Sequence, residues 1–348
     1  MDSMPSKPKG LHVIMSGGTI DFHSNPLVER KTRKVDILIP RENSIIPYFL
    51  EERLKIPSSE ILFSRACMKD SRNLTSQDLE QIASLVRESP YEQVLITHGI
   101  AKMQSTYDFL SGQPGISSKV VGIVGSRMPL SEYHSDGGFM LGYTIAQLQS
   151  NENGMYFFHP DNISATIKSQ IDNIVFLMTG GTIDSSFREQ ADTAKPYEHS
   201  RIPSYFRDIL GAAPAEEKFV FREICMRDSR ELTETDIRAL LQESFNQRHK
   251  KQIITAGTYA LPDLANRHDL MLRRGELPQS KYLFVGAMLP DDVILNDGWF
   301  NLGYAMGKLP EIQNGVYVTM HGWATHPANV MKQIQEARFK LYDESLRG

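Results

Sequence analysis

The chain repeats itself, and this repeat constrains its fold more than any other feature of the sequence. Residues 15–21 read Met-Ser-Gly-Gly-Thr-Ile-Asp, and residues 178–184 read Met-Thr-Gly-Gly-Thr-Ile-Asp. Three further matches follow in the same order: 67–75 with 225–233, 136–143 with 297–304, and 153–156 with 314–317. Four ordered matches at nearly constant spacing indicate a tandem duplication of one domain.

Within each copy, short apolar runs alternate with segments of helical periodicity. The runs that read as buried strands end at glycine, and they are 11–15 with 174–178, 94–97 with 253–255, and 120–124 with 282–285. Thr75 and Thr233 stand before amphipathic segments as helix N-caps. This alternation predicts an α/β fold of two tandem Rossmann-like three-layer domains, over residues 10–165 and 171–340, joined at 160–170.

Composition excludes several classes of function. The 38 basic and 42 acidic residues are interspersed and give a net charge of only -4, so we expect no nucleic-acid partner and no membrane partner. The polar start lacks the apolar stretch of a secretory signal, and no run approaches the length of a membrane span. The two cysteines, Cys67 and Cys225, occupy equivalent strand positions, where we expect free, buried thiols and a cytoplasmic location.

Neither a metal nor another cofactor is expected. The ten histidines show no spacing typical of metal ligands, and the loop that holds His321 and His326 reads as structural. The glycine turns lack the Gly-x-Gly-x-x-Gly pattern and the lysine of a nucleotide-binding loop, which makes nucleotide binding the weakest functional hypothesis.

The candidate chemistry lies in the Gly-Gly-Thr turns. A strand that ends in this tripeptide places a hydroxyl, Thr19 or Thr182, among unobstructed backbone amides at the carboxyl edge of a sheet. The same tripeptide is also compatible with a tight turn and a helix cap alone. The functional interpretation gains support because each copy also has Asp-Ser-Arg, Thr-x-Gly and Gly-x-x-x-Pro after later strands.

These motifs together resemble the N-terminal domain of the bacterial-type asparaginases and glutaminases. The resemblance covers nearly all of both copies, and the chain is also similar to small stand-alone asparaginase-like proteins that consist of this domain. Copy two carries more of the resemblance, in the segments 180–183, 228–229, 254–258, 285–288, 296–301 and 315–322.

The resemblance implies roles for individual residues of copy two. Thr182 would be the nucleophile, Tyr197 would assist it, and Thr258 would act as a second threonine together with Lys332. Substrate would be bound by Gly181 and by Ser229. In copy one only Thr19 and Ser71 retain these roles.

Other positions depart from the family pattern. Copy two has Tyr259 where the family usually has the aspartate that binds the substrate's ammonium, and copy one has Ile100 and Ala101 at this turn. We expect Ala165 at the position of Lys332. The family's C-terminal domain is replaced by the second copy, so an intrachain pseudo-dimer is expected, from which a homo-oligomer could be built.

Two substrate-binding candidates have alternative interpretations. Arg72 and Arg230 follow the serines and could bind a carboxylate or phosphate, or form an internal ion pair with a nearby aspartate. Asp184, like Asp21, could bind an amine or cap the following turn. The leading hypothesis is an amidohydrolase with a threonine nucleophile in copy two, acting on a small amide that need not be free asparagine. The alternative is a binding or regulatory protein without turnover.

Overall fold

The computed structural model describes residues 10–24, 38–40, 42–170, 173–188, 193–212, 219–247, 250–333 and 338–341. The chain divides into two compact units, Met1–Ile163 and Ser164–Gly348, and each is considered by itself. Among the described residues, no helix combines the length and the apolar character needed to cross a membrane.

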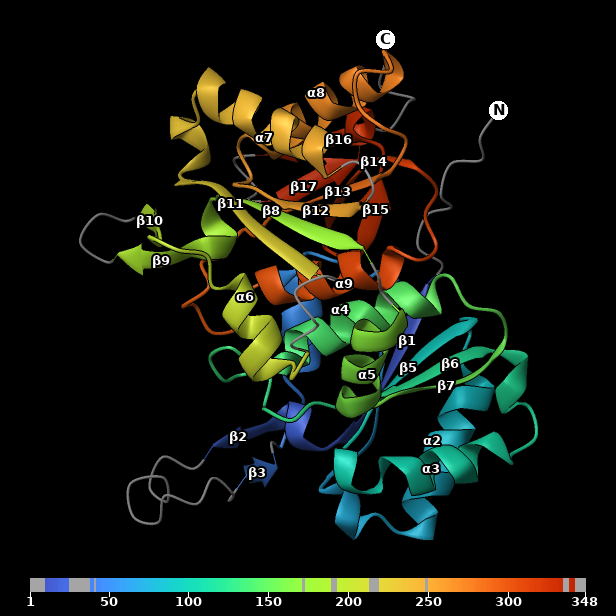
Figure 1. Ribbon diagram of the computed structural model, residues 1–348. Coiled ribbons are helices and arrows are strands. Elements are labelled where there is room, and N and C mark those ends of the chain that lie inside the picture. The colour runs from blue at the N-terminus through green and yellow to red at the C-terminus, as the bar shows by residue number, and fades with distance from the viewer. Residues whose placement is uncertain are drawn as a thin grey trace. The chain divides into compact units, whose positions relative to one another are not determined.

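The first unit contains a five-stranded parallel sheet in the order β4-β1-β5-β6-β7. Its strands are β1 (Leu11–Gly17), β4 (Ile61–Lys69), β5 (Gln93–Thr97), β6 (Val120–Val124) and β7 (Gly154–Phe158), with a small hairpin of β2 (Phe22–Ser24) and β3 (Leu38–Pro40). Its helices are α2 (Ser76–Glu88), α3 (Met103–Ser111) and α4 (Asp136–Leu148), followed by α5 (Pro160–Gln170), in which the unit boundary falls. Helices α2 and α3 cover one face of the sheet and α4 covers the other (Figure 1).

The second unit repeats this architecture, with the sheet order β11-β8-β12-β13-β14-β15. Its main strands are β8 (Ile174–Gly180), β11 (Phe219–Arg227), β12 (Lys251–Thr255), β13 (Lys281–Val285), β14 (Gly315–Met320) and β15 (Trp323–Thr325). Two hairpins accompany them, formed by β9 (Ser185–Arg188) with β10 (Thr193–Pro196) and by β16 (Val330–Gln333) with β17 (Arg338–Leu341). Helices α7 (Glu234–Asn246) and α8 (Leu261–Arg273) lie on one face and α9 (Gly298–Lys308) on the other, while the short α6 (Ile202–Ser204) follows the first hairpin (Figure 1).

The burial of the central strands accounts for the layered fold. Every residue of β1 and of β8 is buried, because helices cover both faces of a parallel sheet. On one face of the first sheet, Ile14 and Val94 join a core cluster with Ile82 of α2. The predicted α/β fold with two Rossmann-like layered domains is confirmed, whereas the domain bounds 10–165 and 171–340 stay a prediction.

The N-cap residues in the sequence predicted the starts of two helices correctly. Thr75 and Thr233 cap α2 and α7, and each forms a reciprocal capping box with an aspartate three residues later. The predicted joint at 160–170 is itself a helix, α5, whose Ile163 and Ile167 are buried one turn apart.

Both cysteines are free, as predicted. The Cys67 Sγ lies 3.3 Å from the Ser16 carbonyl, and the Cys225 Sγ lies 3.6 Å from the Thr179 carbonyl, so the two thiols occupy matching places. Cys67 is buried as predicted, but the prediction of a buried thiol is wrong for Cys225, which is only half-buried.

Candidate active site

The strand order defines where a ligand fits in each unit. The chain leaves the central strand β1 toward β4 on one side and continues on the other side with β5, and β8 lies in the same way between β11 and β12. In doubly wound sheets, ligands bind outside the carboxyl ends of the strands where the order reverses. The Gly-Gly-Thr turns follow β1 and β8 directly, so both lie at this switch point.

Three loops meet at the switch point of the second unit with almost no space between them. Gly180 and Gly181 have φ angles of 88° and 77°, which glycine adopts without steric cost. A Cβ on Gly181 would lie 2.3 Å from the backbone of Gly257, and a Cβ on Gly257 would lie 2.6 Å from the Ser229 Oγ. The Gly-Gly-Thr turn of Thr182, the turn of Thr258 and the loop of Ser229 are therefore in direct contact.

The first unit has the same geometry. A Cβ on Gly18 would lie 2.2 Å from the backbone of Gly99, and a Cβ on Gly99 would lie 2.6 Å from the Ser71 Oγ. Copy one therefore has the same backbone framework, with Ile100 at the position that Thr258 occupies in copy two.

Because the two units have the same geometry here, matched substitutions can test which unit hydrolyses an amide. We expect Gly257→Ala to displace Ser229 and to lower kcat/KM for amide hydrolysis by roughly 10- to 100-fold, since small misplacements at a reacting centre cost about this much. The control is Gly99→Ala, which makes the same contact with Ser71 and should leave kcat/KM nearly unchanged. The measurement is steady-state kinetics of both variants, with circular dichroism to verify folding. Equal losses of kcat/KM in the two variants would contradict the prediction.

The predicted hydroxyls of the site differ in their surroundings. Thr182 opens a 3-10 turn, Thr182–Asp184, and Ser229 opens another, Ser229–Glu231. Both are partly exposed, and among the described residues neither hydroxyl has a hydrogen-bond partner, so both are available to a ligand. Thr258 is almost completely buried, and its methyl group would touch a Cβ placed on Gly286.

Asp184 faces the chain rather than an open site. Its carboxylate is fully buried and accepts hydrogen bonds from the Ser200 hydroxyl at 2.8 Å and the Arg201 backbone N–H at 2.9 Å. Asp21 makes the matching bonds to Ser44 and Ile45 in copy one. Of the two roles left open by the sequence, fixing the following loop is therefore the one present in the structure.

Burial also changes the titration of Asp184. Desolvation raises the pKa of its carboxyl to about 6, against the opposing effect of the hydrogen bonds from Arg201 and Ser200. Because the folded-state pKa is above the unfolded value of about 3.9, this group's contribution to stability is present at low pH and is lost as the pH rises through about 6.

We therefore expect the thermal stability of the wild type, relative to Asp184→Asn, to fall between pH 4 and pH 7. The measurement is the melting temperature of both proteins at half-unit pH steps in buffers of equal ionic strength. Asp208→Asn is the control, because Asp208 is an exposed carboxylate of the same unit whose pKa is lowered by Arg207. A difference between wild type and Asp184→Asn that is constant with pH would contradict the assignment.

Tyr197 lies close to the turn that holds Thr182 and Asp184. Its backbone N–H donates to the Asp184 carbonyl at 2.9 Å, and the Arg201 guanidinium lies 3.9 Å from its ring centroid. The phenol oxygen is buried without a hydrogen-bond partner among the described residues. Desolvation, assisted by the nearby charge of Asp291, raises the pKa of Tyr197, so the phenol remains protonated at neutral pH and can donate a hydrogen bond.

The contacts that Arg201 makes with Tyr197 and with Asp291 were not predicted from the sequence. Arg201 stacks on Tyr197 and also pairs with the buried Asp291 at 3.3 Å. Since Asp291 lies 90 residues further along the chain, no local pattern could have joined it to this loop.

The two arginines after the serines are engaged by neighbouring aspartates. Arg230 donates to both oxygens of Asp228, at 3.0 and 2.7 Å, and Arg72 donates in the same way to Asp70. The internal ion pair, one of the two alternatives, is thus present in both units. The Arg230 guanidinium also lies 5.5 Å from the ring centroid of Tyr259, whose side chain is 48% exposed.

The remaining predicted positions are less informative. Lys332 lies in strand β16, but its side chain falls outside the part of the chain that the structure describes. The expected equivalence of Ala165 with Lys332 is wrong, because Ala165 lies in helix α5.

Copy one contains a buried histidine at the turn where copy two has Ala256. His98 Nδ1 lies 2.7 Å from the Gly99 carbonyl, and burial lowers the pKa of His98 to about 4. The ring is therefore neutral at physiological pH and stabilises the turn rather than carrying charge.

The histidines after β14 have structural contacts. His321 Nε2 lies 3.1 Å from the buried Asp297 carboxylate, and His326 pairs with Asp269 and caps a 3-10 turn. The described residues contain no group of three or more side chains arranged to hold a metal ion.

Comparisons with known proteins identify the family of both halves of the chain. The family description "Asparaginase, N-terminal" matches the chain twice, over residues 10–169 and 173–344. L-asparaginase 1 of Escherichia coli strain K12 is 29% identical over 154 residues, which cover 43% of this chain and 44% of that protein. The chain thus spans about half the length of the curated relatives that it matches.

Two solved asparaginase structures show a more limited similarity to this chain. The thermostable L-asparaginase from Thermococcus kodakarensis is 21% identical with a TM-score of 0.39, and the match covers 48% of this chain and 50% of that one. The probable cytoplasmic L-asparaginase from Campylobacter jejuni is also 21% identical, with a TM-score of 0.37 and coverage of 50% and 54%.

Proposed function

Both halves of this chain belong to the family of asparaginase N-terminal domains, and from this premise we propose that the protein is an asparaginase-like amidohydrolase with its working site in the second unit. The observation that carries the proposal is the contact of three loops at the switch point, where Gly181, Gly257 and Ser229 meet. Thr182 opens the turn beside this contact, and its hydroxyl has no hydrogen-bond partner in the described chain, so it is available to a substrate.

In the proposed reaction, the Thr182 oxygen attacks the amide carbonyl and its proton is transferred to the leaving group, which departs as ammonia. Water then hydrolyses the acyl ester and restores the hydroxyl. Thr258, with Lys332, would accept and return the proton, and Tyr197 would donate a hydrogen bond. The backbone N–H groups around Gly181 would stabilise the developing oxyanion, and Ser229 would bind a substrate carboxylate.

The proposal assigns no turnover to the first unit. Ile100 stands at the second-threonine turn of copy one, so the nucleophile Thr19 lacks a neighbouring hydroxyl there. Thr19, Ser71 and Arg72 would at most bind a ligand in this unit.

Ammonia release across a panel of amides tests the proposal. The panel includes free asparagine, glutamine, N-acetylasparagine and phosphorylated amides, with the Thr182→Ala variant as blank. Release that exceeds this blank supports hydrolysis. Absence of release from every amide, together with saturable binding of one of them, would replace the proposal by the binding or regulatory alternative.

A further inference from the structure

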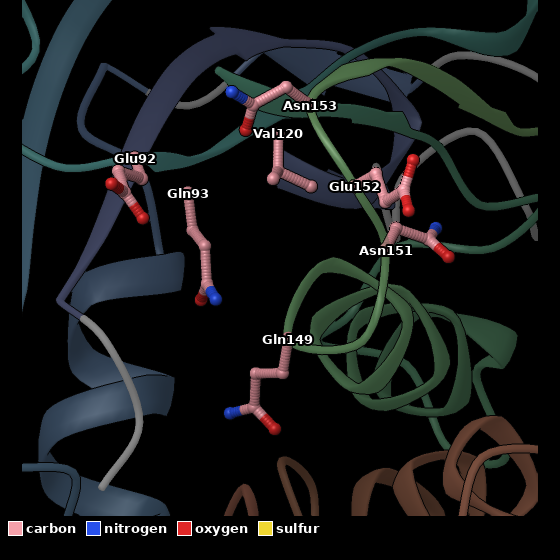
Figure 2. Close-up of a pocket in the computed structure, with 7 residues that line it drawn as sticks. All are labelled: Glu92, Gln93, Val120, Gln149, Asn151, Glu152 and Asn153. Atoms are coloured by element: carbon pink, nitrogen blue, oxygen red, sulfur yellow. The ribbon is translucent and has the colours of Figure 1, made fainter. Parts of the chain in front are cut away.

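Two features of the molecule have no part yet in the proposed reaction. A polar hollow of the first unit is lined by Gln93 and Val120, which begin strands β5 and β6, so it lies at the amino edge of the sheet (Figure 2). Ligands of doubly wound sheets bind at the opposite, carboxyl edge. The second feature is the set of contacts made by Arg201 in the second unit, which lies at the carboxyl edge of its own sheet, beside the turn that begins at Thr182.

Arg201 is held at two points. Its backbone N–H donates at 2.9 Å to the buried carboxylate of Asp184, two residues after Thr182. Its guanidinium pairs at 3.3 Å with Asp291, whose side chain is only 1% exposed. A buried carboxylate without its cationic partner is costly, so this pair fixes the direction of the arginine side chain. The backbone N–H of Asp291 donates in turn to the Ser185 carbonyl at 3.1 Å, which ties its loop to the same turn.

The guanidinium that is fixed in this way covers the ring of Tyr197. Its central carbon lies 3.9 Å from the ring centroid, so the planar cation and the aromatic face are in contact. The backbone N–H of Tyr197 donates to the Asp184 carbonyl at 2.9 Å, and both the backbone and the ring are therefore fixed relative to the turn. The phenol oxygen is buried, with no hydrogen-bond partner among the described residues. Arg201 thus determines where this hydrogen-bond donor lies.

The first unit anchors the same loop without this ion pair. Ile45 is the counterpart of Arg201, since each donates its backbone N–H at 2.9 Å to the aspartate of the preceding Gly-Gly-Thr turn. Leu130 is the counterpart of Asp291, since each lies six residues before the buried aspartate at the start of α4 or α9. Leu130 is buried and neither counterpart carries a charge. The anchoring of this loop therefore does not require the ion pair.

We propose that Arg201 is a positioning residue for amide hydrolysis: paired with Asp291, it holds the phenol of Tyr197 where its hydrogen bond is needed. This inference rests on the function proposed above for the second unit. It accounts for the presence of the ion pair in the unit to which we assign the reaction and for its absence from the other. In the sequence, the offset of 156 residues that relates Arg201 to Ile45 also relates Tyr197 to Arg41, so the first unit has no phenol at this position.

The test is a double-mutant cycle on ammonia release, in which Arg201→Met removes the planar cation but keeps a long side chain. We expect Arg201→Met to lower kcat about tenfold and to change KM by less than about twofold, since small misplacements of a reacting group slow the chemical step. In a Tyr197→Phe background, which lacks the phenol hydroxyl, the same substitution should leave kcat unchanged. Arg207→Met is the control, because Arg207 is an exposed arginine of the same segment that pairs with Asp208.

Two kinetic outcomes would overturn the proposal. One is a loss of kcat that is equal with and without the phenol hydroxyl. The other is a rise in KM with unchanged kcat, because Arg201 would then bind the substrate itself. If Arg201→Met does not fold, Asp291→Asn replaces it, since it removes the charge that fixes Arg201 and should show the same dependence on Tyr197. Equal losses from Asp291→Asn in both backgrounds would again overturn the proposal.

A measurement without turnover separates this proposal from the hydrolysis itself. The fluorine NMR spectrum of the full chain labelled with fluorotyrosine contains one resonance that Tyr197→Phe removes. We expect this resonance to move toward the shift of free fluorotyrosine in Arg201→Met, as for a released ring, and to stay in place in Arg207→Met. A wild type that releases no ammonia refutes the hydrolysis, and a moved resonance then still shows that Arg201 holds the ring. An unchanged resonance in Arg201→Met overturns the positioning role whatever the activity.

Discussion

Replacement of Thr182 by alanine is expected to lower the rate of amide hydrolysis a thousandfold or more. Removal of an activated nucleophile normally costs several orders of magnitude, because the covalent route is lost altogether. The measurement is kcat for ammonia release under saturating substrate. Thr182→Ser keeps a hydroxyl at the same turn and should recover part of the rate.

The matched control is Thr19→Ala, which removes the equivalent hydroxyl from the first unit. The turn that touches Gly18 carries the apolar Ile100 where the second unit has Thr258, so we expect a loss of less than about twofold, as for a residue with no part in the chemistry. If both substitutions lowered kcat equally, the working site would need residues of both units, and the assignment to copy two alone would be wrong.

The second large effect concerns the substrate. We expect kcat/KM to be about a hundredfold higher for an amide that lacks a free ammonium, or carries an extra negative charge, than for free L-asparagine. Tyr259 supplies no carboxylate to pair with an ammonium, and an unpaired buried charge costs about 2 to 3 kcal/mol. Asp184, the carboxylate two residues after Thr182, is engaged by Ser200 and Arg201.

Arg230 provides the control for this preference. Its guanidinium lies over Tyr259 and is 57% exposed, so it can contact an anionic group while it remains paired with Asp228. Arg230→Ala should reduce the advantage of N-acetylasparagine or phosphorylated amides, while Arg72→Ala in the first unit should not. Efficient hydrolysis of free asparagine that survives Arg230→Ala would contradict the expected specificity.

Much of the fold could be predicted from local patterns. The apolar runs before Gly17 and Gly180 identified the central strands, since a strand buried on both faces has no polar alternation. Thr75 and Thr233 marked helix starts because capping depends on residues only three positions apart. The joint at 160–170 was not recognised as a helix, because its burial depends on tertiary surroundings.

Less of the candidate site could be predicted from the sequence. The turns of Thr182, Thr258 and Ser229 could be placed at one sheet edge, since strand order brings them together. The direction of individual side chains could not. Arg230 turns to Asp228 and Asp184 turns to the Ser200 loop, and both choices depend on small conformational preferences that the residue types leave open.

The glycine pair that precedes Thr19 has a consequence for how such chains are surveyed. Gly18 is fixed by the backbone of Gly99 at a distance that admits no side chain, whether or not the unit turns over substrate. Its presence therefore reports the architecture of the turn. A genome survey that scores active centres by Gly-Gly-Thr alone would count two in this chain, although the tripeptide shows only that both turns have the same shape.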